Sequence, residues 1–547
     1  MKTIFTIFGF CLFHMAIGQQ FTAFDLNSKG AAYFGEFTEI GQKAYFSCAT
    51  VGDTNSGIWV TDGTPAGTHV LSKVQAGGNL FFYELTALNN HLIFKAERTY
   101  ADMVNGIELW HSDGTTAGTN ILKDIWPGSG SSVPEQLYLF NGEVFFRATD
   151  SLNGTELWKT DGTANGTILV KNIAPGAAGS FVDNFTALGN QLFFSAYEPT
   201  TGNELWVTDG TPGGTHLFLD INATGNQSAG PRNFYVYQGK LYFTAESAGT
   251  GAELWVSDGT VQGTTFLKDI NPGPDGSGIR EFYGFNGKVY FNAQDDTHGE
   301  ELWVTDGTSG GTYQIKDIHT GSASAYPLGY MNFQGHLYFS AYDDSHGNEL
   351  WYTDGTEAGT QLYLDIIPGS DGSNPASMTT FGDSLYFVAL EAIGDNQMFV
   401  TAGDPAQTHV ISPPGNTAIN PLFGLNFTVF NPVLNSLFFS ADYDQTGQDM
   451  WQYTDASGGV GIEKQIKQQS LFSIWPNPAD DIVRISSQLY PVRPISVEVT
   501  DLQGKITASE SGFSDQMTID ISTLSPGLYM LKLQMGNSTS FHKLVIK

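Results

Sequence analysis

The sequence predicts an all-β protein built from repeated four-stranded sheets. A block of the type Trp-x-x-Asp-Gly-Thr returns at nearly constant intervals, and no stretch shows a sustained helical period. Within each interval, short runs rich in aromatic and β-branched residues alternate with Gly, Asn and Asp. The repeated position is occupied by Trp59, Trp110, Trp158, Trp206, Trp255, Trp303, Trp351, Phe399 and Trp451.

One unit, residues 282–318, shows how each repeat is predicted to divide into four strands. Its first strand ends in a Phe-Asn-Gly turn, and runs at 289–293, 301–305 and 315–318 supply the other three. Several such runs are apolar on both faces, which is incompatible with a sheet that has one solvent-exposed face. Four-stranded sheets that recur every ~40–50 residues and bury both faces by stacking around an axis form a β-propeller.

The two ends of the repeat region predict how the ring closes. Residues 21–26 resemble a fourth strand, whereas the ninth unit decays after Trp451 and keeps only a weak candidate for that strand at 461–466. We therefore expect the N-terminal strand to complete the last blade and to remove the open edge. Because propellers commonly have about four to eight blades, eight blades with an irregular unit, or an open solenoid, are the alternatives to nine.

The repeated Asp-Gly-Thr and Trp residues are interpreted as structural. In Asp306-Gly307-Thr308 the carboxylate can accept a hydrogen bond from the backbone two residues on, and the glycine can adopt a positive φ. Every unit needs the same hairpin, so a structural role is favoured over a functional one. Trp303 and its equivalents are expected to fill the core between blades rather than to bind sugars.

The N-terminus has the pattern of a secretory signal peptide. Lys2 precedes an apolar run from Ile4 to Ile17, and small residues lie before Gln19. The run is too short to span a membrane, so we expect residues 1–18 to be removed and the mature chain to hold no integral membrane segment. We expect Cys48, the cysteine then left, to be a buried thiol without a disulfide partner.

The chain is strongly acidic, with a formal net charge of −32 at pH 7. Residues 471–547 contain six basic and seven acidic residues, so nearly all of this charge lies in the repeats. An acidic body repels phosphate backbones and anionic membranes, which argues against nucleic acid as a partner.

Acidic residues and glycines recur in the predicted loops between the second and third strands. Carboxylate and amide oxygens in short loops can bind Ca²⁺, which makes this ion a candidate cofactor, although the full spacing of a helix-loop-helix calcium site is absent. Solvated turn residues are the alternative interpretation. His298 and His346 recur one unit apart without a third ligand at a zinc-like spacing. The candidate metal ligands are Asp150, Asp295, Asp296, Asp343, Asp344, Asp442 and Asp444.

Near residue 471 the composition changes and the aromatic repeat stops. The sequence predicts a repeat body over 19–466, a polar linker at 467–471, and a small C-terminal β-sandwich over 472–547. The sandwich is expected to contain strands at 482–485, 495–500, 517–521 and 528–533, with a turn at 501–505.

Four motifs in this C-terminal segment resemble those of the type A sorting domain of the type IX secretion system of Bacteroidetes. The resemblance implies passage through the periplasm, export across the outer membrane by the type IX machinery, and removal of the domain as the body is released or anchored to the surface. The residues that carry it are Pro476, Asn477, Pro478, Gly504, Gly527, Tyr529, Lys543 and Lys547.

The body resembles the family of Glu-Leu-Trp-x-x-Asp-Gly-Thr repeat proteins, a resemblance that implies no activity. The motif is present in the six units that begin at residues from Glu108 to Glu349, and it is degenerate in the terminal units. The chain lacks His-Glu-x-x-His, Gly-x-Ser-x-Gly and phosphate-binding loop motifs. We therefore expect an exported surface or secreted protein, and we favour a non-enzymatic scaffold that binds a glycan or protein partner over an enzyme. The alternative is a secreted glycan-active hydrolase or lyase with its site on the loop-rich face.

Overall fold

A computed structural model describes most of the repeat body and the strands of the C-terminal segment. Apart from the short stretch Ala187–Leu192, the chain divides after residue 460 into two compact units. The described residues are 19–26, 31–35, 37–50, 56–72, 84–97, 106–176, 179–223, 227–391, 396–416, 430–444, 448–455, 472–475, 482–487, 494–500, 505–513, 516–525, 527–535 and 538–546.

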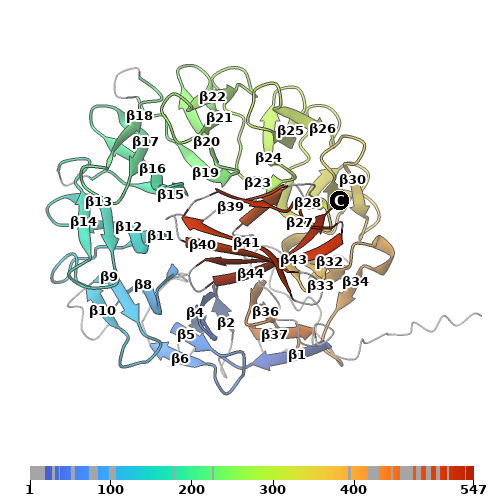
Figure 1. Ribbon diagram of the computed structural model, residues 1–547, viewed down its shortest axis with the longest axis horizontal. Coiled ribbons are helices and arrows are strands. Elements are labelled where there is room, and N and C mark those ends of the chain that lie inside the picture. Colours follow the sequence, from blue (N-terminus) through green and yellow to red (C-terminus); the bar gives the residue numbers. More distant parts are fainter. Residues whose placement is uncertain are drawn as a thin grey trace, which may run out of the picture. The chain divides into compact units, whose positions relative to one another are not determined.

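The described part of the repeat body contains nine antiparallel sheets arranged as blades around a ring (Figure 1). The strands of each blade are named a to d from the centre of the ring outwards. Blade 1 consists of β2 (Ala32–Phe34), β4 (Lys43–Thr50), β5 (Gly57–Thr61) and β6 (His69–Ser72), with β3 (Thr38–Ile40) paired to β4. The β-propeller prediction is confirmed, with nine blades rather than eight.

The next seven blades repeat one strand order. Blade 2 is β7 (Leu85–Leu88), β8 (His91–Glu97), β9 (Ile107–Ser112) and β10 (Asn120–Lys123); blade 3 is β11 (Glu135–Phe140), β12 (Glu143–Asp150), β13 (Gly154–Thr160) and β14 (Ile168–Lys171). Blade 4 is β15 (Asp183–Leu188), β16 (Gln191–Glu198), β17 (Gly202–Thr208) and β18 (His216–Leu219); blade 5 is β19 (Arg232–Tyr237), β20 (Lys240–Ser247), β21 (Gly251–Ser257) and β22 (Thr265–Lys268).

Blade 6 is β23 (Phe282–Phe285), β24 (Lys288–Asp295), β25 (Gly299–Thr305) and β26 (Tyr313–Lys316). Blade 7 is β27 (Leu328–Phe333), β28 (His336–Asp343), β29 (Gly347–Thr353) and β30 (Gln361–Leu364); blade 8 is β31 (Ala376–Phe381), β32 (Ser384–Leu390), β33 (Asn396–Thr401) and β34 (His409–Ile411), with a 3-10 turn η1 (Pro405–Gln407) before its last strand.

The ring closes through the N-terminal strand, as predicted. Blade 9 has the order β1 (Gln19–Phe24), β37 (Asp449–Asp455), β36 (Ser436–Ala441) and β35 (Asn431–Val433), and β1 lies beside β37 in Figure 1. The register runs from Gln19 opposite Asp455 to Phe24 opposite Met450. The closing strand therefore supplies strand d of the last blade, and the open-solenoid alternative is wrong. The weak candidate at 461–466 lies outside the described residues.

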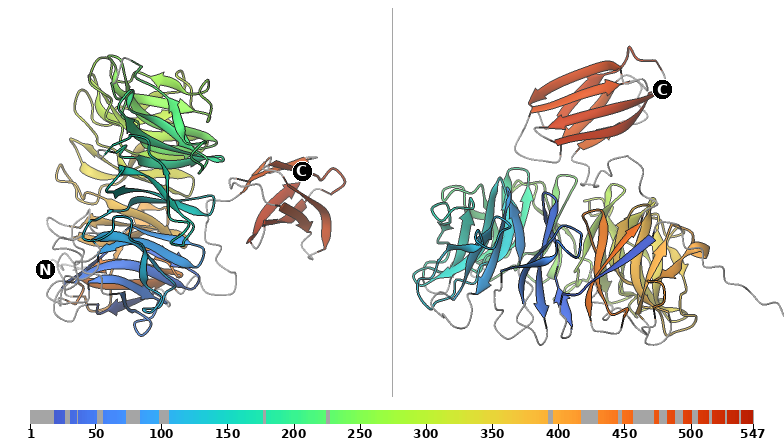
Figure 2. Two further views of the ribbon diagram at one scale, coloured as in Figure 1. Left: turned by 90° about the vertical axis from the view of Figure 1, so that its left-hand side faces the viewer. Right: turned by 90° about the horizontal axis from the view of Figure 1, so that it is seen from below.

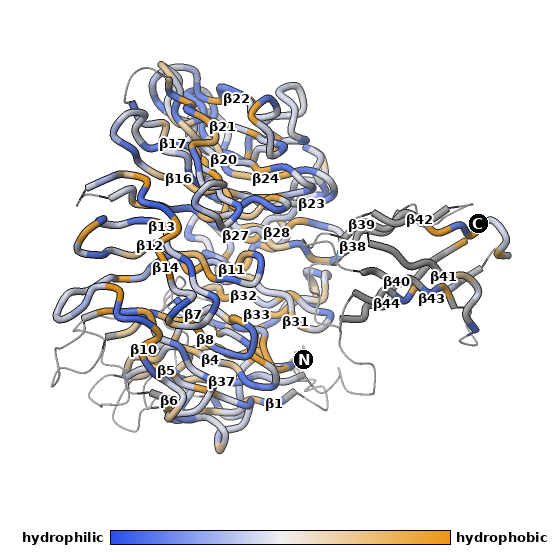
Figure 3. Tube along the Cα trace, turned by 60° about the vertical axis from the view of Figure 1, so that its left-hand side comes forward, coloured by the Kyte–Doolittle hydropathy of each residue, from blue (hydrophilic) through white to orange (hydrophobic). Residues whose placement is uncertain are grey.

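The core lies between blades. Side views show sheets standing face to face around the ring (Figure 2), and apolar residues follow the strands (Figure 3). Trp303 of blade 6 belongs to the same buried cluster as Tyr242 and Leu254 of blade 5, and the repeated Trp or Phe side chains are only 3–8% exposed. Between blades 9 and 1, Phe438 stacks on Phe37 with ring centroids 5.3 Å apart. The interblade role predicted for the tryptophans is confirmed.

Two further expectations concern the described residues as a whole. Cys48 is buried and free of any disulfide, as expected. None of the described helical segments is long and apolar enough to cross a membrane.

The C-terminal unit contains two sheets in its described part. One has the order β38 (Phe472–Trp475), β39 (Ile482–Ser487) and β42 (Gln516–Asp520). The other has the order β41 (Ile506–Phe513), β40 (Pro494–Thr500), β43 (Gly527–Met535) and β44 (Ser538–Ile546). The four predicted runs fall on strands β39, β40, β42 and β43, whereas β38, β41 and β44 were not predicted as strands. The polar sequence of β41 lacks a clear apolar alternation.

Candidate functional site

The two faces of the ring carry different kinds of connection. The a–b and c–d turns lie on one face, and the b–c loops and the linkers from strand d to the next strand a lie on the other, which we call the linker face. On the first face, the Asp306 carboxylate accepts hydrogen bonds from Thr308 N and Oγ1 at 2.9 and 2.7 Å. These bonds lower the pKa of Asp306. The same turn recurs at Asp62, Asp113, Asp161, Asp209, Asp258 and Asp354.

The glutamate of the Glu-Leu-Trp motif holds the linker of its own blade. Glu301 is fully buried, and its two carboxylate oxygens accept hydrogen bonds from the backbone N–H groups of Ile318 and His319 at 2.9 and 3.0 Å. Burial raises the pKa of this group, and those of Glu204 and Glu253, to about 7, although the backbone donors partly oppose the shift. We call this arrangement, a buried carboxylate that accepts backbone N–H groups of the following linker, the glutamate bracket. It recurs at Glu108, Glu156, Glu204, Glu253 and Glu349.

Blade 9 makes an equivalent bracket across the closure of the ring. Asp449 occupies the position of the motif glutamate, and its Oδ1 atom accepts a hydrogen bond from Leu26 N at 3.3 Å. Burial raises the pKa of Asp449 to about 7. The linker that follows β1 is thus held like those of the other blades, although its acceptor comes from the far end of the repeat body.

The six linkers between blades 2 and 8 each pass through one fixed backbone position before the next strand a. The N–H of Phe181 donates to Thr155 O at 3.2 Å, and the carbonyl of Ser180 accepts from Tyr197 N of the next blade at 2.8 Å. Corresponding bonds recur in the other linkers. We call these positions the junction residues, and all of them have positive φ: Val133, Phe181, Gly230, Gly278, Tyr326 and Asn374.

The junction residues differ sharply in their side chains. Phe181 and Tyr326 have φ of 48° and 50° and are 56% and 55% exposed. An aromatic residue in the left-handed region costs about 1–3 kcal/mol, and here the surrounding backbone bonds impose it. Gly230 and Gly278 occupy the two linkers between them and adopt the same conformation without that cost.

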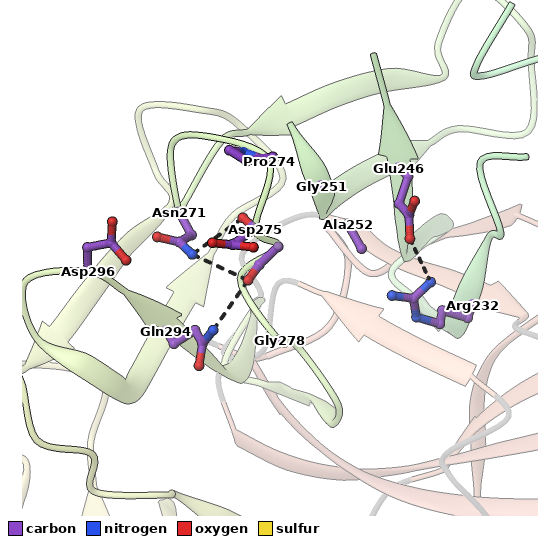
Figure 4. A pocket seen from close by; sticks show the side chains of 11 residues that line it. Arg232, Glu246, Gly251, Ala252, Asn271, Pro274, Asp275, Gly278, Gln294 and Asp296 are labelled. Atoms are coloured by element: carbon purple, nitrogen blue, oxygen red, sulfur yellow. Dashed lines mark hydrogen bonds and ion pairs between the residues drawn. The ribbon is translucent and has the colours of Figure 1, made fainter. Parts of the chain in front are cut away.

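A polar hollow of about 510 Å³ lies on the linker face where blades 5 and 6 meet (Figure 4). Gly278 lies on its wall, where an added Cβ would meet nothing closer than Gln294 Cδ at 3.6 Å. Asn271 donates to the carbonyl oxygens of Asp275 and Gly276 at 3.3 and 3.4 Å. The lining residues are Arg232, Glu246, Gly251, Ala252, Asn271, Pro274, Asp275, Gly276, Gly278, Gln294 and Asp296.

Arg232 and Glu246 lie together at one end of this hollow and are open to solvent (Figure 4). Arg232 Nη1 lies 3.8 Å from Glu246 Oε1, and the two side chains are 47% and 51% exposed. Gln294 donates from Nε2 to Gly276 O at 3.4 Å. Apart from Asp296, named above as a candidate metal ligand, sequence reasoning missed this site, because its residues come from two blades and their loops share no linear motif.

The candidate metal ligands lie in b–c loops of four blades. The carboxylates of Asp150, Asp295 and Asp343 accept backbone N–H groups of their own turns at 2.6–2.8 Å. Asp296 lines the hollow, and Asp344 pairs with His319 at 3.1 Å. Asp442 and Asp444 lie between β36 and β37 of blade 9.

The histidines of these loops also bind their own turns. His298 and His346 contact Asp295 and Asp343 through Nδ1 at 3.0 and 2.9 Å, and these contacts raise the pKa of both imidazoles. Within the described part of the chain, no three His, Cys, Asp or Glu side chains are grouped as a metal site would need. Calcium binding therefore stays a prediction.

Three of the residues that carry the sorting resemblance lie within the described part of the C-terminal unit. Tyr529 Oη donates to Ser525 O at 3.0 Å, Gly527 begins β43, and Lys543 lies opposite Met530 in the β43–β44 pair. The remaining positions, outside the described residues, are Pro476, Asn477, Pro478, Gly504 and Lys547.

Comparison with protein families identifies the C-terminal unit. Residues 473–547 match the secretion system C-terminal sorting domain. This domain points to export by the type IX secretion system to the cell surface or beyond it. The resemblance of the repeat body to the Glu-Leu-Trp repeat family stays a prediction. No curated protein matches the sequence of this chain.

Several solved structures resemble the chain in part. A puromycin hydrolase is 14% identical over 66% of this chain and 59% of its own, with a TM-score of 0.34. A prolyl endopeptidase is 11% identical over 74% of this chain and 54% of its own, with a TM-score of 0.35. The β-propeller domain of the Trilobed protease from Pyrococcus furiosus is 11% identical over 61% and 97%, with a TM-score of 0.32. The chain thus spans less than two thirds of the length of the puromycin hydrolase and of the prolyl endopeptidase.

Proposed function

We propose that this protein is a non-enzymatic binding scaffold, delivered by the type IX machinery, whose linker face binds a glycan or protein partner outside the cell. The observation that carries the proposal is the contrast between the two faces. The c–d turns repeat one hydrogen-bonded arrangement, whereas equivalent junction positions on the linker face carry Val, Phe, Gly, Tyr or Asn. A rigid frame that varies on a single face is suited to recognition.

The repeated acidic residues support a scaffold rather than an enzyme. The motif glutamates are fully buried and bind backbone N–H groups, so they are committed to holding the linkers. The turn aspartates are likewise bound to their own threonines. One observation favours the alternative of a glycan-active hydrolase: Glu246, Asp275 and Asp296 all line the same hollow. Paired carboxylates are the usual catalytic groups for glycoside hydrolysis.

Binding and turnover assays on the purified mature protein test both functions. We expect the protein to be retained on immobilised glycans or to capture a partner from the cell envelope, and to release no sugar from cell-wall and algal polysaccharides. Retention of no ligand in either format would contradict the scaffold. Sustained release of reducing sugar that is lost in Glu246→Gln or Asp296→Asn would establish the hydrolase instead.

A further inference from the structure

Four successive linkers carry, at one backbone position, an aromatic residue, two glycines and a second aromatic residue. Phe181, Gly230, Gly278 and Tyr326 have φ between 48° and 65°, so the backbone is the same and only the side chain differs. At the two outer junctions an aromatic ring stands more than half exposed, and at Gly278 the missing side chain leaves the hollow open. Along the propeller, the polar hollow is thus flanked by two exposed aromatic side chains.

We propose that this arc of the linker face is a carbohydrate-binding site. The hollow between blades 5 and 6 takes one end or one short segment of an oligosaccharide, and the rings of Phe181 and Tyr326 contact the chain on either side. The proposal deepens the binding function above and rests on it. Sugars present hydroxyl groups at their edges and C–H groups on their faces, so they match a site that combines polar groups with exposed aromatic rings.

The polar groups of the hollow suit hydroxyl ligands. Arg232 and Glu246 are about half exposed and point toward one another in Figure 4, so both can exchange part of their mutual contact for hydroxyl groups. Gln294 adds an amide that both donates and accepts. The volume of about 510 Å³ falls in the usual range of ~300–1,000 Å³ for small-molecule sites.

The charge of the site selects the class of sugar. Three carboxylates, those of Glu246, Asp275 and Asp296, line the hollow together with one guanidinium, that of Arg232. The whole chain has a formal charge of −32, so uronic and sulfated polysaccharides are repelled at long range as well as in the hollow. The expected ligand is a neutral oligosaccharide.

The experiment uses the mature full-length chain and two matched substitutions. Gly278→Tyr places at the hollow the side chain that Tyr326 already carries in the same backbone conformation, so it should fold and fill the site. Asn374→Tyr makes the equivalent change at a junction that does not line the hollow. Calorimetry or affinity electrophoresis measures Kd for neutral gluco-, manno-, galacto- and xylo-oligosaccharides, with alginate and sulfated galactan as anionic probes.

We expect at least one neutral series to bind, Gly278→Tyr to weaken it about tenfold or more, and Asn374→Tyr to leave it unchanged. Phe181→Gly and Tyr326→Gly should each weaken binding of longer chains, while the melting temperature stays at or above that of the wild type because backbone strain is relieved. A structural role alone would lower the melting temperature and leave Kd unchanged.

The remaining outcomes separate this site from the proposed function. Glycan binding that Gly278→Tyr does not weaken would overturn the site and leave the binding function in place. Capture of a protein partner without any glycan would overturn the carbohydrate class and leave the scaffold. Preference for the anionic probes would overturn the charge argument, and with it the assignment to neutral sugars. Retention of no ligand of either kind would overturn both proposals.

Discussion

The buried motif glutamate illustrates how a single residue holds this architecture together. Glu301 lies on strand c and bonds to the linker that leads into the next blade, so it ties the outer end of one sheet to the start of the next. Leaving a buried N–H group without an acceptor costs about 1–3 kcal/mol.

Replacing Glu301 by Ala should therefore destabilise the protein by about 2–5 kcal/mol, because the buried N–H of Ile318 and the part-buried N–H of His319 lose their acceptor. Hydrogen exchange measured by mass spectrometry should show faster exchange at Ile318 and His319, together with a lower melting temperature. Asp371→Ala, at an exposed loop residue, is the control and should change the amide exchange rates and the melting temperature by little. Unaltered exchange at the linker amides would show that the bracket does not support the fold.

The raised pKa values predict a pH dependence of stability with a definite sign. Groups such as Glu204 and Glu253, whose pKa is about 7 in the folded chain, stabilise it most below pH ~4.5 and lose this contribution as pH rises through 7. The turn aspartates have lowered pKa values, so their contribution is present above pH ~3.8 and lost in stronger acid.

The melting temperature should consequently be higher near pH 5 than near pH 8. Repeating the measurement in 0.5 M NaCl is the control, because salt screens repulsion between exposed charges and leaves buried groups largely unaffected. A melting temperature that rises steadily from pH 5 to pH 8 would be incompatible with neutral, buried glutamates.

These residues also show what sequence could and could not predict at this scale. The hydrogen bond from Thr308 N to the Asp306 carboxylate was predictable because both partners lie within one turn. The glutamate bracket joins residues 17 apart, a separation shared by Glu253 with Ile270 and Glu301 with Ile318. That constant spacing was a visible signal, but periodicity alone does not reveal which group accepts and which donates.

At the scale of elements, the closing strand has the largest structural effect. Six residues of β1 pair with β37, and Phe21 contacts Phe439, Tyr443 and Tyr453 with ring centroids 5.0–6.5 Å apart. Sequence predicted this strand because it resembles the other outer strands. It could not predict the hollow, which depends on how two blades and a glycine junction meet in space.

Deleting residues 20–27 should expose the edge of β37 and the apolar surface around Phe438, Phe439 and Trp451. Loss of several buried aromatic contacts at ~25 cal/mol per Å² should lower stability by several kcal/mol and promote aggregation. Thermal melting and light scattering, compared with the wild type, measure both effects. An unchanged midpoint with a monodisperse monomer would rule out a closing role for β1.

At the scale of the whole molecule, the repeat body and the sorting domain are built from separate sets of strands. The body completes its hydrogen-bonded sheets with strands from residues 19–455, and the sorting match begins at residue 473. Among the described residues the two parts share no sheet, since the sheets of the C-terminal unit contain only their own strands.

A chain that ends after residue 467 should fold and accumulate in the periplasm instead of reaching the surface or the medium. Cell fractionation with immunoblotting measures this, and limited proteolysis checks that the retained body is folded. The full-length chain expressed in parallel is the control. Appearance of the shortened chain outside the cell at the wild-type level would remove the sorting domain from the export route.

Closure by the first strand also determines the order in which the protein can be synthesised, folded and exported. Strand β1 is synthesised early, but its partner β37 follows more than 400 residues later, and the sorting domain follows β37. Each chain must keep its first strand unpaired until almost the whole body has been made, which favours late closure and slow folding. A chain whose synthesis stops within the repeats therefore lacks both β37, the partner for closure, and the sorting domain. Such a chain cannot complete its propeller and carries no export signal at its C-terminus.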